Sequence, residues 1–207
     1  MYIHFFKRLI DAVLSFVGLI VLSPVFAVVA VLIKTDSKGP VFFVQERVGK
    51  NKKPFKIYKF RTMSTDCPAN MPTHLLGNAG AFITPIGGFL RKFSIDELPQ
   101  IWNILKGDMT IIGPRPALFN QTDLLELRDS NGSNALKPGL TGYAQIHGRD
   151  ELPIDVKANL DGYYAQNIGF WLDFKCFFGT IFKVLKSDGV VEGATAEKSN
   201  DKEVLMK

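Results

Sequence analysis

A single apolar run near the N-terminus constrains this chain more than any other part of its sequence. Residues 12 to 33 carry no charged side chain, and an apolar run of that length predicts a helix able to cross a membrane. Ser23 and Pro24 lie near its midpoint, where a proline removes one helical hydrogen bond and clashes with the preceding turn. Pro24 leaves the Ile20 carbonyl without its usual donor, and we expect the Ser23 hydroxyl to help satisfy the exposed backbone.

Charges on both sides of the run bear on its topology. Lys7 and Arg8 precede the run, Lys34 and Lys38 follow it, and cytoplasmic flanks of membrane segments are rich in such residues. Each half of the run is about 18 Å long as a helix, too short for a hydrocarbon core of about 30 Å. A helix-break-helix that enters and leaves on one face satisfies both flanks. A spanning helix that is merely kinked at Pro24 remains an equal alternative on these grounds.

The composition of the whole chain indicates one folded domain with anionic partners. The 207 residues suffice for one domain with its own core and an appendage. A formal net charge of +5 favours nucleic acid, lipid headgroups or phosphorylated small molecules as partners. Cys67 and Cys176 are far apart and predict no disulfide framework, which fits a reducing cytoplasm. The three histidines have no spacing typical of metal ligands.

Hydrophobic periodicity after residue 36 predicts an α+β fold that is mainly helical. A β-hairpin with its turn at Gly49–Pro54 is expected first, followed by a helix that Thr84 caps and Pro85 begins. The sequence further predicts a helix that ends before Gly107, a short buried strand leading into a Pro-Arg-Pro turn, and helices over 117–128 and 153–166. These elements divide the chain into a membrane segment (1–36), one compact domain (37–190) with a polar loop (64–80), and a polar tail expected to be disordered (191–207).

Residues 170 to 186 form a second unusual stretch, rich in aromatic side chains. At helical spacing Lys175, Lys183 and Lys186 gather on one side, and aromatic residues cover most of the rest. A buried core helix and an interfacial helix, with aromatics at the headgroup level and lysines near anionic lipid, explain this pattern about equally well. Together with the apolar run, the second interpretation favours a protein seated on one face of a membrane.

Two adjacent acids mark the densest cluster of chemistry-bearing residues. Asp96 and Glu97 lie near the start of a predicted helix, and Ser94 with Glu97 matches a capping box. Pro99 weakens that explanation, because it would be the fifth residue of a helix capped at Ser94, so we expect the helix to begin near Asp96 or Leu98. At 100° per residue Asp96 falls opposite the apolar stripe and faces solvent or a cleft. Capping alone and a functional site both remain open interpretations.

Basic residues near these acids indicate a phosphate-binding site. Strand alternation places Lys59 and Arg61 on one face, Arg91 precedes the acids, and Arg115 lies in a stiff turn. A simple charged surface strand is the commoner explanation for the first two. Together with the carboxylates, however, such a set suits phosphate groups and a Mg²⁺ ion held between carboxylate and phosphate oxygens. These residues alone do not specify a reaction.

Five motifs in one order make the chain similar to a known family. The Ser-Pro-broken run is followed by "KIYKFRTM" (56–63), "SIDELPQIWNILKGDM" (94–109), "IGPRP" (112–116) and "KPGLTG" (137–142). With this combination the chain closely resembles the bacterial sugar transferase family, the monotopic phosphoglycosyl transferases, over residues 1 to 190. It resembles the small form of the family, which consists of the catalytic unit alone. The resemblance implies a re-entrant membrane helix and a location on the cytoplasmic face of the bacterial inner membrane.

The resemblance also implies an activity and roles for individual residues. It implies transfer of a sugar 1-phosphate from a UDP-sugar to undecaprenyl (polyprenyl) phosphate, with release of UMP and an aspartyl-phosphosugar intermediate. Asp96 would be the nucleophile and Glu97 its acidic partner, both near Mg²⁺. The turn Pro114, Arg115 and Pro116 would contact the nucleotide, whereas Lys59, Arg61, Arg91 and Arg149 would bind phosphates and Asp161 would support them.

Other functions remain to be tested against this one. A non-catalytic membrane adaptor would keep its function after Asp96→Asn, and a UDP-sugar hydrolase would release UMP without a lipid acceptor. Nucleic acid is disfavoured as a partner because of the apolar N-terminus. The sequence does not specify which sugar is transferred, although the resemblance favours N-acetylated or modified amino sugars. It also leaves open the final glycan, which could be O-antigen, capsule or glycoprotein. The oligomeric state is open as well, and a homo-oligomer is one of the options.

Overall fold

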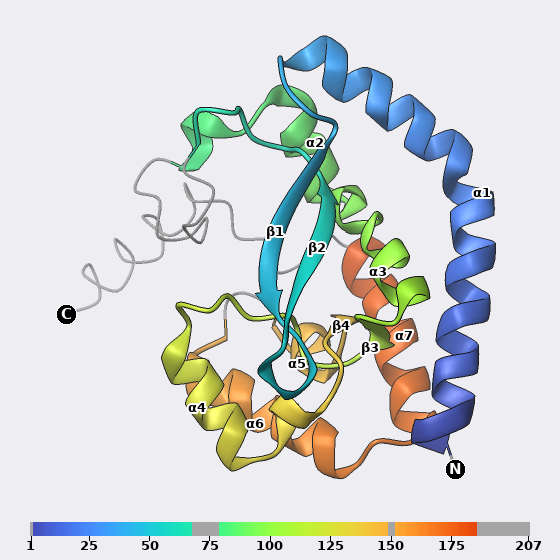
Figure 1. Cartoon of the computed structure of the whole chain (residues 1–207), viewed down its shortest axis with the longest axis vertical. Coiled ribbons are helices and arrows are strands. Elements are labelled where there is room, and N and C mark those ends of the chain that lie inside the picture. Colours follow the sequence, from blue (N-terminus) through green and yellow to red (C-terminus); the bar gives the residue numbers. More distant parts are fainter. Residues whose placement is uncertain (1, 68–78, 149–151, 186–207) are drawn as a thin grey trace.

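The computed structural model describes residues 2–67, 79–148 and 152–185, which form a mainly helical α+β fold (Figure 1). Most of the polar loop at 64–80 and all of the tail at 191–207 lie outside the described residues. The elements in chain order are η1 (Tyr2–Phe6), α1 (Lys7–Asp36), β1 (Phe42–Val48), η2 (Lys50–Lys52), β2 (Pro54–Phe60), η4 (Ala79–Phe82), α2 (Pro85–Lys92), η5 (Ile95–Glu97), α3 (Gln100–Lys106), β3 (Thr110–Ile112), α4 (Thr122–Ser130), η6 (Ser133–Ala135), β4 (Gly139–Thr141), α5 (Tyr143–Ile146), α6 (Ile154–Gln166) and α7 (Phe170–Leu185).

The apolar run forms α1, one helix of 30 residues with Pro24 inside it. The Ser23 hydroxyl donates to the Ile20 carbonyl over 2.7 Å, as expected from the sequence, and so satisfies the acceptor that Pro24 leaves free. The break expected at Ser23-Pro24 is therefore a bend within one continuous helix (Figure 1). By length and composition, α1 is the one helix among the described residues that could cross a membrane.

The N-terminal half of α1 is attached to the domain by polar contacts. Arg8 donates from its two terminal nitrogens to the carbonyls of Ile104 and Leu105, 2.6 and 2.7 Å away, at the C-terminal end of α3. Asp11 is buried and accepts hydrogen bonds from the Thr110 hydroxyl and the Ile111 N–H, at 2.7 and 3.0 Å. The amino end of α1 is thus bound to α3 and β3.

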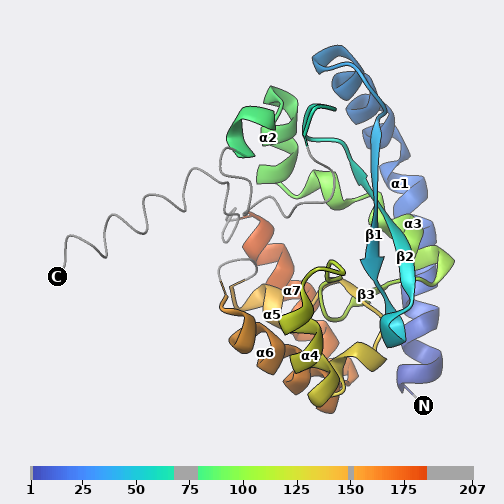
Figure 2. The same ribbon diagram turned by 60° about the vertical axis from the view of Figure 1, so that its left-hand side comes forward.

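The C-terminal half of α1 packs on the same domain through apolar side chains. Val29 and Ile33 are buried against Phe60 of β2 and Leu90 of α2. Asp36, the last residue of α1, accepts a hydrogen bond from the N–H of Ile86 near the start of α2. Both ends of the helix therefore contact one domain, and Figures 1 and 2 show α1 running along its side.

The hairpin predicted from the sequence is confirmed. β1 pairs antiparallel with β2 from Phe42 opposite Phe60 to Val48 opposite Pro54. The fully buried Asn103 joins this hairpin to α3, since its amide accepts from the Tyr58 N–H and donates to the Lys56 carbonyl. The side chain thereby acts as a hydrogen-bonding neighbour for β2 and holds the strand against the helix.

The predicted helices around the two acids are confirmed in position but not in every boundary. Thr84 caps α2 by accepting from the Gly87 N–H, with Pro85 as the first residue, and Gly107 ends α3 with φ of 100°. Between them, residues 95 to 97 form a 3₁₀ turn, and regular helix begins only at Gln100, later than expected. Ser94 makes no capping hydrogen bond from its side chain, so the capping box does not form.

Two short parallel strands, β3 and β4, lie next to the remaining helices. β3 pairs with β4, which the sequence did not predict, and Gly139 permits this because a Cβ there would lie 2.2 Å from the Gly113 nitrogen. The helix predicted over 153–166 is confirmed as α6. Figure 2 shows α4, α5, α6 and α7 grouped together, and α7 also contacts α1, because Lys7 pairs with Asp173 over 2.6 Å.

We expect Asp11→Ala to lower the free energy of unfolding by about 1–3 kcal/mol, because it leaves the Thr110 hydroxyl and the Ile111 N–H buried without an acceptor. Thermal unfolding of the purified protein in detergent measures this change. Glu126→Ala removes a carboxylate exposed on α4 and serves as control. Equal unfolding temperatures for the two variants would show that the Asp11 contacts do not hold α1 to the domain.

Candidate active site

Two cationic side chains from separate segments meet at Glu97. Lys59 of β2 donates to Glu97 Oε1 over 2.8 Å. Arg115 donates from Nη2 to Oε1 over 2.8 Å and from Nη1 to Oε2 over 3.3 Å. Glu97 is only 7% exposed, so its carboxylate is a buried acceptor shared by two cations.

Asp96, the neighbouring acid, has a different environment. It is partly exposed, and none of the residues that the structure describes gives its carboxylate a hydrogen bond or an ion pair. Burial and then the charge of Glu97 raise its pKa to about 6, while Lys59, Arg91 and Arg115 act in the opposite direction. Asp96 is thus an electrostatically constrained carboxylate in reach of three cations, which suits a nucleophile or a metal ligand.

The same surroundings act on Glu97 with the opposite result. Burial alone would raise the pKa of Glu97, but Arg115 and Lys59 outweigh it and hold this pKa well below its usual range. Adjacent carboxylates with pKa values driven apart by their environments take different chemical roles. Here Glu97 is held in its ionised form by two cations, and Asp96 has a pKa shifted toward neutrality.

The segment between α2 and α3 brings these acids to the cations. Ser94 lies in the left-handed region with φ of 55°, a costly conformation for a residue with a Cβ, and it turns the chain sharply after α2. Arg91, three residues earlier, donates from Nε to the Thr62 hydroxyl over 3.0 Å and so faces the end of the hairpin. The strained turn places Asp96 and Glu97 at the junction of α2, α3 and β2.

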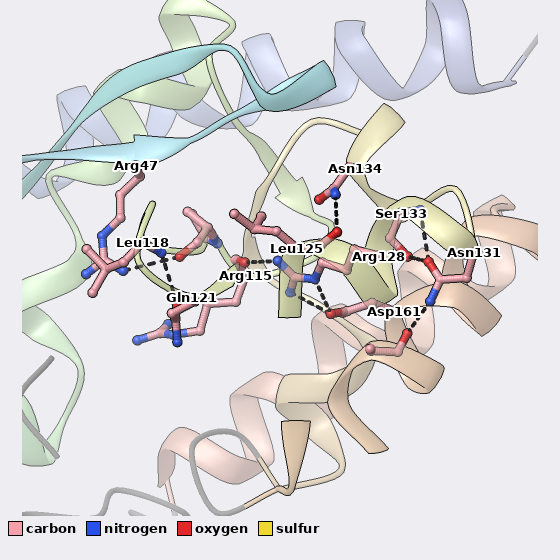
Figure 3. A network of polar contacts seen from close by, with 12 residues as sticks. Arg47, Arg115, Leu118, Gln121, Leu125, Arg128, Asn131, Ser133, Asn134 and Asp161 are labelled. Atoms are coloured by element: carbon pink, nitrogen blue, oxygen red, sulfur yellow. Dashed lines mark hydrogen bonds and ion pairs between the residues drawn. The ribbon is translucent and has the colours of Figure 1, made fainter. Parts of the chain in front are cut away.

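The Pro-Arg-Pro turn is held by the carbonyl groups of four consecutive residues. Gly139 N–H donates to the carbonyl of Pro114 and Arg128 to that of Arg115, over 2.8 and 3.0 Å. The carbonyl of Pro116 accepts from the Arg47 side chain at 3.4 Å (Figure 3), and that of Ala117 accepts from the Val48 N–H at 2.9 Å. These bonds to other elements also explain why α4 begins at Thr122 and not at 117, since carbonyls bound elsewhere cannot start a helix.

Not every residue predicted for the site joins this cluster. Arg61 is buried, and its guanidinium makes four hydrogen bonds to the segment after α1, at Ser37, Lys38 and Pro40. Asp161 is 1% exposed and pairs with Arg128. Both side chains thus make structural contacts. Arg61 satisfies carbonyl groups after α1, and Asp161 neutralises the buried charge of Arg128. Arg149 lies outside the described residues.

Comparison with known proteins agrees with this arrangement. The family model described as "Bacterial sugar transferase" matches residues 2–187. The chain belongs to the bacterial sugar transferase family. The family resemblance inferred from the motifs is therefore confirmed.

Several relatives of this sugar transferase carry informative names. The chain is 38% identical to an uncharacterized sugar transferase, EpsL, of Bacillus subtilis, across 93% of this chain and 94% of that protein. It is equally identical to a UDP-N-acetylgalactosamine-undecaprenyl-phosphate N-acetylgalactosaminephosphotransferase of Aeromonas hydrophila (89% of this chain, 45% of the relative). The same identity holds for a UDP-glucose:undecaprenyl-phosphate glucose-1-phosphate transferase of Klebsiella pneumoniae (86% and 40%). The chain spans less than half the length of these last two proteins.

Three residues that position the site of this sugar transferase were missed by the sequence reasoning. Asn103 is an amide within an otherwise apolar helix, a pattern that signals a buried hydrogen-bonding role. Arg128 and Arg47 support the Pro-Arg-Pro turn, but nothing in the sequence near them distinguishes them from exposed basic residues. Their partners are far away in the chain, so only the tertiary structure reveals them.

The carboxylates allow a test of the expected Mg²⁺ ion. Among residues 2–67, 79–148 and 152–185, no three His, Cys, Asp or Glu side chains gather into a metal-binding group. Mg²⁺ commonly binds one or two carboxylates together with substrate phosphates, so Asp96, whose oxygens accept no hydrogen bond from the described residues, fits as its protein ligand. Glu97 fits less well, because both of its oxygens already accept hydrogen bonds from Lys59 or Arg115.

We expect opposite stability changes at pH 7.5 from neutralising the two acids. Because the pKa of Asp96 is raised from its usual value to about 6 in the folded state, its ionisation destabilises the fold progressively between about pH 4 and pH 6 and fully above that, so Asp96→Asn stabilises by at most about 3 kcal/mol. The pKa of Glu97 is lowered, so its stabilisation is present at neutral pH, and Glu97→Gln destabilises. Thermal unfolding between pH 4 and pH 8 measures both.

The pH dependence provides the control for this prediction. The stabilisation by Asp96→Asn should shrink as pH falls from about 6 to about 4, because the folded-state carboxyl becomes protonated while the unfolded-state carboxyl is still largely ionised. A stabilisation that does not change with pH would contradict the electrostatic explanation.

Proposed function

We propose that this protein transfers a sugar 1-phosphate from a UDP-sugar to undecaprenyl phosphate, releasing UMP. The product, a polyprenyl-diphosphate-sugar, would begin a bacterial polysaccharide pathway at the membrane. The observation that carries the proposal is the carboxylate of Asp96, which no residue in the described part of the chain binds, beside the cation-bound Glu97. Relatives named as undecaprenyl-phosphate sugar phosphotransferases support the reaction class.

The first step uses Asp96 as the nucleophile. A carboxylate oxygen of Asp96 attacks the sugar-bearing phosphorus of the donor and forms an acyl phosphate. The bond between this phosphorus and the bridging oxygen breaks, and UMP leaves with the electron pair. A pKa of about 6 keeps most of the Asp96 carboxyl ionised, and hence nucleophilic, at neutral pH.

The second step returns the enzyme to its starting state. An oxygen of the lipid phosphate attacks the same phosphorus, and the bond to Asp96 breaks to restore the free carboxylate. Lys59, Arg91 and Arg115 supply positive charge near the phosphates in both steps. Mg²⁺, when bound at Asp96, offsets further phosphate charge. Because UMP departs before the lipid attacks, one small site serves two anionic substrates in turn.

The surface of two helices supports membrane attachment. On α7, Trp171 is 77% and Phe182 65% exposed, so the aromatic face of this helix is not a domain core. Much of α1 is likewise apolar and exposed, with Ile20 and Val21 at 58% and 66%. Side chains of this kind are stable in contact with lipid, and the acceptor substrate is itself a membrane lipid.

The contacts of α1 support placement on one membrane face. Arg8, near the start of the helix, and Asp36, at its end, both bond to the folded domain. A helix spanning the bilayer would place these residues on opposite faces, about 40 Å apart at helical rise. One domain cannot contact both, so we propose that α1 is re-entrant and that the domain sits on the cytoplasmic face.

We expect UMP release that depends on the donor sugar, the lipid acceptor and Mg²⁺. The experiment incubates purified protein with a panel of UDP-sugars, with and without polyprenyl phosphate and Mg²⁺, and measures UMP. One donor from the panel should react, which identifies the sugar. Asp96→Asn should lower the rate on the order of 10³-fold or more, because it removes the nucleophile.

Two controls separate this proposal from its rivals. Glu126→Gln, exposed on α4, should retain the wild-type rate. UMP release without lipid, sustained over many turnovers, would indicate a hydrolase. Activity unaffected by Asp96→Asn would remove Asp96 as the nucleophile, and no release from any donor would favour a non-catalytic membrane adaptor.

We expect tags at the N-terminus and at the C-terminus to be accessible from the same side of the membrane. Protease digestion of right-side-out spheroplasts and inverted membrane vesicles measures this directly. Both tags should be cleaved only in inverted vesicles, since both lie on the cytoplasmic face. Cleavage of the N-terminal tag in spheroplasts would show that α1 spans the membrane and that Pro24 is only a kink.

A further inference from the structure

Arg128 and Asp161 form a buried ion pair beside the proposed active site (Figure 3). Arg128 of α4 donates from Nε and Nη2 to Asp161 Oδ2 of α6, over 2.9 and 2.5 Å. The residues are 3% and 1% exposed, so neither side chain has open access to solvent. Burying two charges is costly, and an ion pair in this setting needs a reason other than stability alone.

The third nitrogen of Arg128 provides that reason. Its Nη1 donates to the carbonyl of Arg115 over 3.0 Å. The side chain of Arg115 donates hydrogen bonds to Glu97, which is next to the proposed nucleophile. The backbone of Arg115 is thus held by Arg128, and its guanidinium is held by Glu97.

The hydrogen bonds of α4 and α6 keep this pair in place. Asn131, which follows α4, donates to the Ala158 carbonyl of α6 over 2.7 Å. Gly162 allows the close approach, because a Cβ there would lie 2.7 Å from the Asn131 amide nitrogen. The two helices therefore present Arg128 at a fixed position behind the Pro-Arg-Pro turn.

We propose that Arg128 is a positioning residue for Arg115 and that Asp161 sets the orientation of Arg128. Neither side chain contacts a substrate, since all three guanidinium nitrogens of Arg128 are bonded to protein. Asp161 thus acts on the phosphates only indirectly. It binds Arg128, Arg128 binds the backbone of Arg115, and the side chain of Arg115 lies at Glu97 in the site. This inference rests on the proposed function of Arg115 at the phosphates.

A double-mutant cycle tests the proposal. Arg128→Lys keeps a charge for Asp161 but cannot also reach the Arg115 carbonyl with a planar fork of donors. In the wild-type background we expect it to lower kcat/KM for the UDP-sugar on the order of 10²-fold, the scale expected for misplacing a catalytic group by about 1 Å. In the Arg115→Ala background the same change should cost less than about twofold. Equal losses in both backgrounds would overturn the proposal.

A second variant guards against a folding defect. The double variant Arg128→Met with Asp161→Leu replaces the buried pair by apolar side chains, which often preserves or raises stability. It should fold with an unchanged or higher unfolding temperature and still lose kcat/KM on the order of 10²-fold. A folded variant with wild-type kcat/KM would overturn the role of Arg128.

An activity-independent measurement separates this proposal from the proposed function. In protein labelled with ¹⁵N-arginine, the Arg115 Nε–H signal, assigned with Arg115→Ala, should be resolved and slowly exchanging in the wild type. It should broaden or exchange rapidly in Arg128→Lys, and remain unchanged in the control Glu126→Gln. An unaltered signal in Arg128→Lys would overturn the positioning role. An altered signal in a protein that releases no UMP would instead leave the positioning intact and refute the proposed reaction.

Discussion

The buried carboxylate of Glu97 is the constraint on which the rest of this structure depends. It accepts hydrogen bonds from Lys59 on the hairpin and from Arg115 on the Pro-Arg-Pro turn. Three segments that are distant in sequence are thereby brought to one point. A buried charge is tolerated only when it is paired, so the hairpin, the strained turn before α3 and the Pro-Arg-Pro turn must all be in place together.

This arrangement gives two adjacent acids different properties. The cations bound to Glu97 lower its pKa, while burial and the charge of Glu97 raise that of Asp96 to about 6. The fold thus contains a carboxylate, the proposed nucleophile, whose ionisation it does not favour, a cost typical of catalytic sites. Stability comes from Glu97, and the proposed chemistry comes from Asp96.

The apolar helix α1 is part of the same design. Its Arg8 and Asp11 bond to α3 and β3, and its last two turns pack on β2 and α2. These are the elements that flank Asp96, so the contacts that hold α1 to the domain also help to place the two acids. A membrane segment that is also a wall of the domain can position a water-soluble site at the depth of a lipid phosphate.

The sequence alone predicted the hairpin, the cap at Thr84, the helix end at Gly107 and the local role of Ser23, because each follows from contacts within a few residues. The motifs likewise identified the family and the two acids. Only the tertiary structure decided that Glu97 is paired with two cations, whereas no described residue binds the Asp96 carboxylate. It also decided that Arg61 bonds to the segment after α1 and that Asp161 pairs with Arg128. These assignments depend on pairing between distant segments and on burial, and neither quantity is encoded in the spacing of residues along one stretch of chain.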